Sequence, residues 1–311
     1  PHNRWAFQNM SQLFPTATVG RGGGVASDFT RRPQDLGAVA LTRLDGSQAT
    51  VDEVLAETYS DGFLLLHRGA IVMERYFNGM TAETRHLAQS VSKSLIGCLA
   101  GILIGRGLID PERPLEHYLP ALARSGYAGA AVWHPLDMRS GVRFTEDYSD
   151  PKAEFVYLDM AAGWKARSRP EAPATIHGLL RALEQARPHG GAIQYRSVES
   201  DVVAWVCEAV TGLPLQRLLS EEIWSHVGAE RDAYFSKGFL LKLAELQGKG
   251  TIQFDQHVSV LFNSNYVMVS PRFFIYVPDD PEPVLHVQID VIRETDDEGV
   301  YCTVVSVDDA D

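Results

Sequence analysis

The order of sequence patterns along the chain predicts an α/β (α+β) fold, in which an antiparallel sheet is flanked by helices and a helical lobe is inserted. Two short β-like runs near residue 70 predict a hairpin, and an apolar helical pattern follows at about residue 95. Residues 108–235 carry further helical patterns, and the chain after about residue 250 is rich in β-branched and aromatic residues. Sheet-forming segments therefore stand at both ends of a helical middle.

This order predicts two lobes. We expect a discontinuous α/β lobe made of residues 1–107 plus 236–311, and a mainly helical lobe made of residues 108–235. A chain of 311 residues is long enough for both. A cleft between two lobes is a common place for a small-molecule site.

The composition is that of an ordinary globular protein with an acidic balance. Hydrophobic residues make up 45% of the chain and charged residues 22%, which excludes a disordered or fibrous chain. The 28 Lys and Arg against 40 Asp and Glu give a net charge of −12, which repels phosphate backbones and anionic lipid. We therefore expect no nucleic-acid partner and no membrane partner. No run of sequence is long and apolar enough to span a bilayer and no signal segment is found, so we expect a cytoplasmic location.

Three cysteines stand far apart in the sequence: Cys98, Cys207 and Cys302. Without a Cys-x-x-Cys pair they form neither a zinc ribbon nor a disulfide framework. We expect buried free thiols.

The hairpin and the helix after it are the clearest elements. Residues 63–67 and 71–77 have the composition of strands, and Arg68-Gly69 between them predicts a tight turn. The helix after them has apolar residues at helical spacing, namely Leu95, Ile96, Leu99, Ile102 and Leu103. We expect it to end near Gly105 and Gly107, because glycine readily adopts a left-handed cap.

Later elements are predicted from helical spacing and from β-rich composition. Residues 175–186 and 200–210 have the clearest helical patterns of the middle, and Asp201 lies near the start of the second, where a negative charge is favoured. Four late runs predict a four-strand antiparallel meander, namely residues 252–262, 266–277, 284–293 and 300–307.

Ser90-Val91-Ser92-Lys93, at the start of the strongest helix, is a candidate nucleophile site. Residues three apart on a helix lie on one face, about 5–6 Å apart between Cβ atoms, so Lys93 can reach the Ser90 hydroxyl. A lysine whose pKa is lowered by burial can take the serine proton. A second Ser-x-x-Lys, residues 149–152, contains Pro151 and opens no amphipathic helix, so we set it aside. Taken alone, the motif fits an ordinary N-cap serine better than a nucleophile.

Tyr195, in the segment Gln194-Tyr195-Arg196-Ser197, is a candidate proton relay. A phenol beside a lysine ammonium ionises more easily and can pass a proton to a leaving group. Taken alone it also fits a half-buried loop tyrosine. No Gly-x-Ser-x-Gly and no His-Glu-x-x-His occurs in the sequence, which counts against an α/β-hydrolase and a zincin.

The segment 86–95, HLAQSVSKSL, resembles the nucleophile region of the 6-aminohexanoate-dimer hydrolases, which belong to the class C β-lactamase and D,D-peptidase superfamily. Other segments resemble that family in order and spacing, namely residues 1–7, Asp137-Met138, Glu146-Asp147-Tyr148, Ala162-Gly163-Trp164, Asp201-Val202 and residues 230–233. The resemblance covers about residues 1–235 and implies a β-lactamase-like, penicillin-recognition fold.

The resemblance implies roles for three candidate catalytic residues. Ser90 is expected to be the acylated nucleophile and Lys93 its base, and Tyr195 is expected to protonate the leaving group. No metal and no organic cofactor is implied.

The resemblance also implies a substrate pocket. Tyr148 is similar to a mobile tyrosine that contacts the scissile amide, and Asp159 and Trp164 match pocket residues of the family. An anionic Asp159 suits the ammonium end of a 6-aminohexanoate unit.

The chain departs from the family at two places. Glu199 stands where the family usually has asparagine, two residues after the serine that follows the catalytic tyrosine. Residues 236–311 do not resemble the family's C-terminal part, which carries a third motif that completes the oxyanion hole. Lys249-Gly250-Thr251 is the nearest echo of that motif, with its residues in a different order.

Three hypotheses follow. The first is a serine amidase or esterase that cleaves small linear amides, 6-aminohexanoate oligomers, or carboxylic esters through an acyl-enzyme. The second is a D,D-peptidase or β-lactamase, and the third is a binding or scaffold protein that has lost turnover with the third motif. We expect a small-molecule substrate, and the sequence leaves open whether the chain forms a homodimer.

Overall fold

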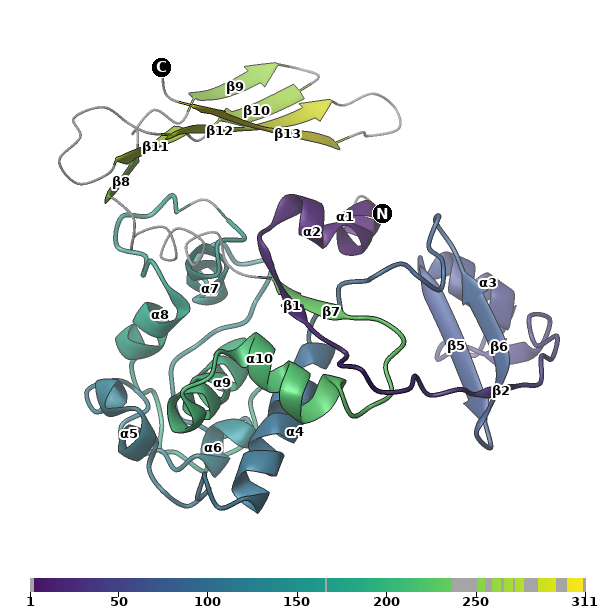
Figure 1. Cartoon of the computed structure of the whole chain (residues 1–311), viewed down its shortest axis with the longest axis horizontal. Helices are drawn as coiled ribbons and strands as arrows, with labels where there is room; N and C mark the ends of the chain where they lie inside the picture. The colour runs from purple at the N-terminus through teal and green to yellow at the C-terminus, as the bar shows by residue number, and fades with distance from the viewer. Residues whose placement is uncertain are drawn as a thin grey trace.

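The computed structural model describes residues 3–165 and 167–236, and beyond them the backbone of six strands (Figure 1). The helices are α1 (Asn3–Gln8), α2 (Met10–Leu13), α3 (Val51–Glu57), α4 (Val91–Gly105), α5 (Leu115–Tyr118), η1 (Pro120–Leu122), α6 (Trp133–Leu136), α7 (Phe155–Ala161), α8 (Ile176–Ala182), α9 (Ser197–Thr211), α10 (Leu215–Leu219) and η2 (Ser220–Trp224). The strands are β1 (Thr16–Val19), β2 (Thr30–Arg31), β3 (Ala40–Thr42), β4 (Gln48–Thr50), β5 (Gly62–His67), β6 (Ala70–Tyr76), β7 (Ala233–Ser236), β8 (Thr251–Phe254), β9 (Ser259–Asn263), β10 (Tyr266–Ser270), β11 (Arg272–Tyr276), β12 (Leu285–Glu294) and β13 (Tyr301–Asp309).

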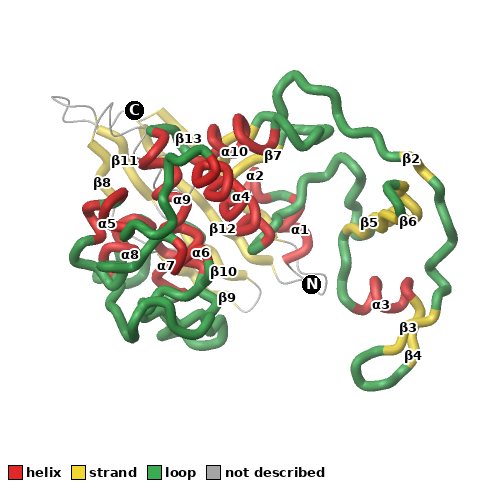
Figure 2. Tube along the Cα trace, turned by 90° about the horizontal axis from the view of Figure 1, so that it is seen from below, coloured by secondary structure: helices red, strands yellow, loops and turns green. Residues whose placement is uncertain are grey.

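The predicted hairpin is confirmed. β5 and β6 pair antiparallel, and β2 adds a parallel strand to β6. Arg68 and Gly69 both have positive φ, 50° and 76°, which is the geometry of a tight two-residue turn between right-twisted strands. Figures 1 and 2 show this sheet and α3 to one side of the helices α4–α10.

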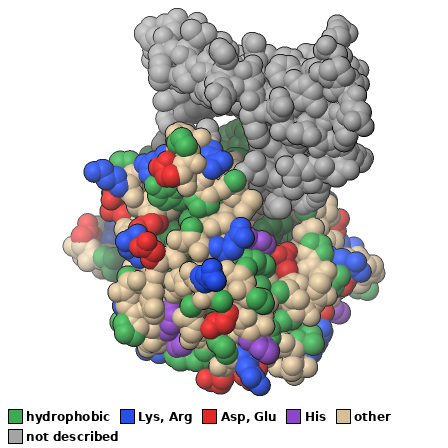
Figure 3. Space-filling model, turned by 90° about the vertical axis from the view of Figure 1, so that its left-hand side faces the viewer, with side chains coloured by type: hydrophobic (Ala, Val, Ile, Leu, Met, Phe, Trp, Pro, Cys, Tyr) green, Lys and Arg blue, Asp and Glu red, His purple; other side chains and the backbone are tan. Residues whose placement is uncertain are grey.

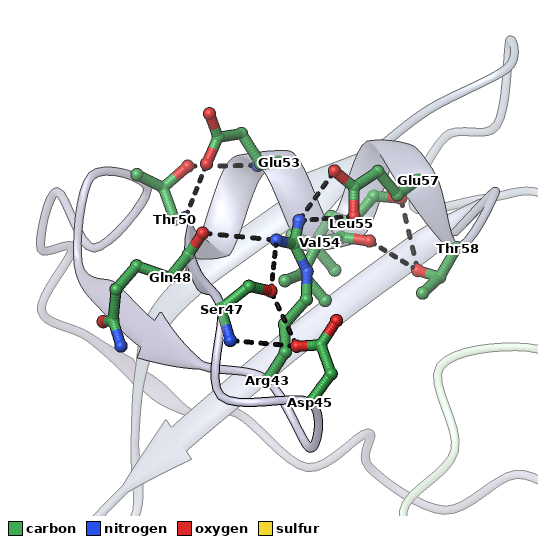
Figure 4. A network of polar contacts seen from close by, with 10 residues as sticks. All are labelled: Arg43, Asp45, Ser47, Gln48, Thr50, Glu53, Val54, Leu55, Glu57 and Thr58. Atoms are coloured by element: carbon green, nitrogen blue, oxygen red, sulfur yellow. Dashed lines mark hydrogen bonds and ion pairs between the residues drawn. The ribbon is translucent and has the colours of Figure 1, made fainter.

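The start of α3 is closed by side chains that the sequence analysis did not identify (Figure 4). The Thr50 Oγ1 accepts a hydrogen bond from the Glu53 amide, and a Glu53 carboxylate oxygen accepts one from the Thr50 amide. This reciprocal pair satisfies two of the amide groups that a helix start leaves without partners. Arg43, from the loop before β4, donates to both carboxylate oxygens of Glu57 and so ties the loop to the end of the helix.

The helical core forms around α4 and α9. Leu99 and Leu103 of α4 and Val202 and Val206 of α9 are all almost fully buried. Burying an aliphatic side chain of this kind contributes about 1.5–3 kcal/mol, so the two helices hold each other at a defined separation. Gly107 and Gly212 follow these helices with positive φ, 72° and 68°. The predicted left-handed end of α4 is thereby confirmed.

Strands from the two ends of the helical part meet. β1 pairs antiparallel with β7, with Thr16 opposite Ser236 and Val19 opposite Ala233. The chain therefore returns to its N-terminal segment after α10. The boundaries of the two predicted lobes are not tested by this pairing and stay a prediction.

The predicted four-strand meander is wrong. The late segment forms six strands in the order β8-β11-β12-β10-β9, with β13 on the other edge of β12. Two of the predicted runs each contain two strands, because β-rich composition marks where strands can form but not where one ends. A meander also assumes that sequence neighbours pair, whereas β8 pairs with β11.

The cysteine prediction is half right. Cys207 is buried in α9, as expected, whereas Cys98 of α4 is exposed. Apolar spacing identified α4 correctly but did not show that the face carrying Cys98 lies outside the core. Cys302 lies outside the residues whose side chains the structure describes.

The described surface mixes charges. On the face drawn in Figure 3, acidic and basic side chains are interspersed rather than gathered by sign. In the described part of the chain, no single helix is long and apolar enough to cross a bilayer, and the bent pair Ser197–Thr211 and Leu215–Trp224 meets that test by length and composition only.

Candidate active site

Ser90 occupies the N-cap position of α4, but its hydroxyl does not cap the helix. Its side chain makes no cap hydrogen bond, and its backbone is already helical, with φ −67° and ψ −10°. The preceding residue, Gln89, has a backbone φ of 47°, which residues other than glycine rarely adopt. Such backbone strain often occurs at functional sites. The alternative of an ordinary N-cap serine is therefore wrong.

Three predicted side chains meet at the Ser90 hydroxyl. The Lys93 ammonium donates to Ser90 Oγ at 2.9 Å, and the Tyr195 hydroxyl donates to the same oxygen at 2.6 Å. The Lys93 Nζ also lies 5.2 Å from the centroid of the Tyr195 ring. In the described part of the chain, Ser90 Oγ accepts two hydrogen bonds and donates none. To lose its own proton it needs one neighbour to become a neutral amine or a phenolate.

A buried polar network lies directly behind Tyr195. The Arg196 guanidinium donates to Glu199 at 3.0 Å and to the Ser140 carbonyl at 2.9 Å, and the Ser140 hydroxyl donates to Glu199. Arg196 and Glu199 are both almost completely buried. Burial raises the pKa of Glu199, while Ser140 and Arg196 oppose that rise. Glu199, one of the departures from the resembled family, thus serves as the partner of a buried arginine.

Asp201 lies near Lys93, and Glu146 lies near Asp201. Burial raises the pKa of Asp201, in α9, to about 7, with Lys93 lowering it and Glu146 raising it. Glu146 accepts hydrogen bonds from Ser197 at the start of the same helix. Sequence analysis matched Glu146 and Asp201 to a family segment but assigned them no role, and it did not single out Ser197.

Asp201 should make stability depend on pH. Because its pKa is raised on folding, the protonated carboxyl stabilises the fold below the unfolded value near 4, and this contribution is lost as pH rises through about 7. Asp201→Asn cannot titrate. Its stability relative to the unsubstituted protein should therefore improve steadily between pH 4 and pH 8, as measured by urea midpoints followed by tryptophan fluorescence. Asp28→Asn, at an exposed position, is the control, and a pH-independent difference for Asp201→Asn would contradict the prediction.

In the described part of the chain, the three predicted pocket residues, Tyr148, Asp159 and Trp164, form no hydrogen bond, ion pair or ring contact with Ser90, Lys93 or Tyr195. Tyr148 is 71% exposed, its hydroxyl donates to Glu146 at 2.7 Å, and its ring packs edge-on against Phe155. The hydrogen bond to Glu146 is the main reason that the pKa of Tyr148 is raised to about 12, and Tyr195 and Asp159 add to the shift. Tyr148 therefore lies near Tyr195 and is a neutral phenol at neutral pH.

Asp159 lies in the last turn of α7, and Trp164 lies three residues after the end of that helix. The Asp159 carboxylate forms an ion pair with Lys165 at 2.7 Å, and the Trp164 ring stacks on Phe14 with 5.6 Å between ring centroids. A substrate ammonium would have to compete with Lys165 for Asp159. A surface hollow of about 340 Å³ lies beside this region, lined by Tyr148, Ser149, Asp150, Pro151, Val156, Met160, Lys165, Ser168 and Arg169.

Two other sequence features can be placed. In the second Ser-x-x-Lys, the Ser149 hydroxyl donates to Asp147 within a turn, so it is engaged locally. Lys249-Gly250-Thr251, the nearest echo of the third motif, lies outside the residues whose side chains the structure describes.

Comparisons with known proteins match the region that holds this site. A family model described as Beta-lactamase matches residues 48–236. The 6-aminohexanoate-dimer hydrolase of Paenarthrobacter ureafaciens is 40% identical over 238 residues, which is 75% of this chain and 57% of that protein. A solved structure described as "Putative 6-aminohexanoate-dimer hydrolase from Bacillus anthracis" superposes with a TM-score of 0.72 at 26% identity, covering 77% of this chain and 63% of that one. The chain thus spans less than two thirds of the length of either relative.

Proposed function

Because the chain belongs to the Beta-lactamase family, we propose that it is a serine hydrolase in which Ser90 is acylated by a small amide or ester. Family membership also confirms the predicted β-lactamase-like fold of mixed helices and sheets. The observation that carries the proposal is the Ser90 Oγ, which contacts the Lys93 amine and the Tyr195 phenol at once.

The reaction uses these groups in turn. Lys93 or Tyr195, in its deprotonated form, takes the Ser90 proton as Oγ attacks the substrate carbonyl carbon. The tetrahedral intermediate collapses when Tyr195 returns a proton to the leaving amine or alcohol. A water molecule, deprotonated by the same groups, then hydrolyses the acyl-serine ester and restores the serine hydroxyl.

The substrates we propose are short linear amides of the 6-aminohexanoate type and small carboxylic esters. The first follows from the relative of Paenarthrobacter ureafaciens, which is a 6-aminohexanoate-dimer hydrolase. The second follows from the chemistry. An ester has a better leaving group than an amide, so its departure depends less on proton transfer from Tyr195. Lys165 at Asp159 also disfavours a cationic substrate end, so esters are the better first assay.

A fluorophosphonate probe tests the nucleophile directly. We expect one adduct on the folded protein, located on Ser90 by peptide mass spectrometry, because only this serine has an amine and a phenol within hydrogen-bond distance in the described part of the chain. Protein unfolded in urea is the control, since unfolding separates Tyr195 from Ser90. Folded protein without a Ser90 adduct, or equal labelling of folded and unfolded protein, would refute the proposal.

A further inference from the structure

The Glu146 carboxylate joins the loop between α6 and α7 to the start of α9. One of its oxygens, Oε1, accepts hydrogen bonds from the Tyr148 hydroxyl and the Ser197 hydroxyl, both at 2.7 Å. The other, Oε2, accepts a hydrogen bond from the Ser197 backbone amide at 2.6 Å. We call Glu146, Tyr148 and Ser197 the Glu146 clasp. Hydrogen bonds to an ionised carboxylate are about twice as strong as neutral ones, so the clasp is a firm connection.

The start of α9 has no local cap of its own. Its N-cap residue, Arg196, is extended, with φ −150° and ψ 128°, and makes no side-chain cap hydrogen bond. The Arg196 guanidinium instead turns into the core toward Glu199. The amide of Ser197 therefore takes its acceptor from Glu146, 51 residues earlier in the sequence. A carboxylate at this point also complements the positive end of the helix dipole.

We propose that Glu146 is a positioning residue that holds the first turn of α9, and with it Tyr195, at the distance from Ser90 that proton transfer requires. The proposal rests on the proposed function, because it gives Glu146 a role in that reaction. Tyr195 precedes Ser197 by two residues and reaches Ser90 across 105 positions of sequence, so its location depends on how this turn is held.

The clasp has a second arm, in which the Tyr148 hydroxyl donates to Oε1 of Glu146. This hydrogen bond is the main reason that the pKa of Tyr148 is raised to about 12. An amide in place of the carboxylate presents an NH₂ group where one oxygen stood. Glu146→Gln therefore keeps the size of the side chain, but its NH₂ group cannot accept a hydrogen bond, so at least one of the three hydrogen bonds is lost or reversed in direction.

Kinetics of p-nitrophenyl acetate hydrolysis test the role in positioning. A misplacement of about 1 Å can cost about 100-fold in rate, and we expect Glu146→Gln to lower kcat about tenfold with KM changed less than about twofold. In a Tyr195→Phe background the same substitution should lower kcat less than about twofold, because Glu146 acts through the phenol. A merely structural role would cause the same tenfold loss in both backgrounds, and that result would overturn the proposal.

Asp147→Asn is the matched control. Asp147 is the neighbouring carboxylate on the same loop, is exposed, and its side chain accepts hydrogen bonds from the amide and the hydroxyl of Ser149. We expect its kcat to equal that of the unsubstituted protein. Equal kcat values for Glu146→Gln and Asp147→Asn would show that the clasp has no role in turnover.

Hydrogen exchange gives a readout that does not need turnover. In Glu146→Gln the Ser197 amide should exchange about tenfold faster than in the unsubstituted protein, and in Asp147→Asn it should exchange at the original rate. Faster exchange in a protein that shows no Ser90-dependent hydrolysis would mean that the clasp holds and the proposed function fails. Unchanged exchange would overturn the clasp whatever the activity.

Discussion

Ser90→Ala is expected to lower the hydrolysis of p-nitrophenyl acetate by at least about 10³-fold. The substitution removes the only atom that forms the covalent bond to the acyl group, and loss of a nucleophile in a comparable serine enzyme lowers kcat by about 10⁶-fold. The remaining Lys93 and Tyr195 keep their places but have no hydroxyl to act on. The measurement is the release of p-nitrophenol at saturating ester.

Ser94→Ala is the matched control for this substitution. Ser94 is exposed on α4, one turn after Ser90, so the two variants remove the same group from the same helix. Ser94→Ala should retain the original rate. If Ser90→Ala also retained it, hydrolysis would come from elsewhere, and the hypothesis of a scaffold protein without turnover would be favoured.

Tyr195→Phe is expected to lower kcat by about 10²–10⁴-fold, the usual contribution of a positioned proton-transfer group. The substitution removes the hydroxyl that donates to Ser90 Oγ at 2.6 Å and keeps the ring that lies 5.2 Å from the Lys93 Nζ. The cation–π contact, about 0.5–1 kcal/mol at exposed positions, is therefore retained. A loss of rate then reports on the proton alone.

The size of the loss should depend on the leaving group. An alkyl amine needs a proton to depart and p-nitrophenolate does not, so Tyr195→Phe should harm the hydrolysis of a linear amide more than that of p-nitrophenyl acetate. Tyr59→Phe, at an exposed position on the turn after α3, should leave both rates unchanged. Equal rates for Tyr195→Phe and Tyr59→Phe would remove Tyr195 from the mechanism.

Sequence patterns succeeded where the relevant contacts are local. Arg68-Gly69 predicted the turn between β5 and β6, because a two-residue hairpin needs positive φ angles at both positions. The apolar spacing of residues 95–103 predicted α4, because helical geometry brings these side chains to one side. The first fifty residues carry no such period, and their short helices and strands were missed.

Patterns failed where pairing or burial depends on distant segments. The late strands were recognised by composition, but their order was wrong, because a strand's partner is chosen among all exposed edges and not by sequence order. Cys98 was expected to be buried because its helix is apolar, whereas burial depends on which neighbours cover each face. The sequence suggested that Glu199 replaces a residue of the catalytic site. In the structure, however, Glu199 is the ion-pair partner of Arg196 in the core.

The contacts of the candidate site also divide into local ones, which the sequence predicted, and distant ones, which it did not. The contact of Ser90 with Lys93 was predictable from the residues alone, because positions three apart on a helix always share a face. Family resemblance named Tyr195, but its arrival at Ser90 depends on the buried packing of α4 against α9 and on a carboxylate, Glu146, from a third segment. Such contacts depend on the burial of many side chains from distant segments, and the spacing of residues within one segment does not predict them.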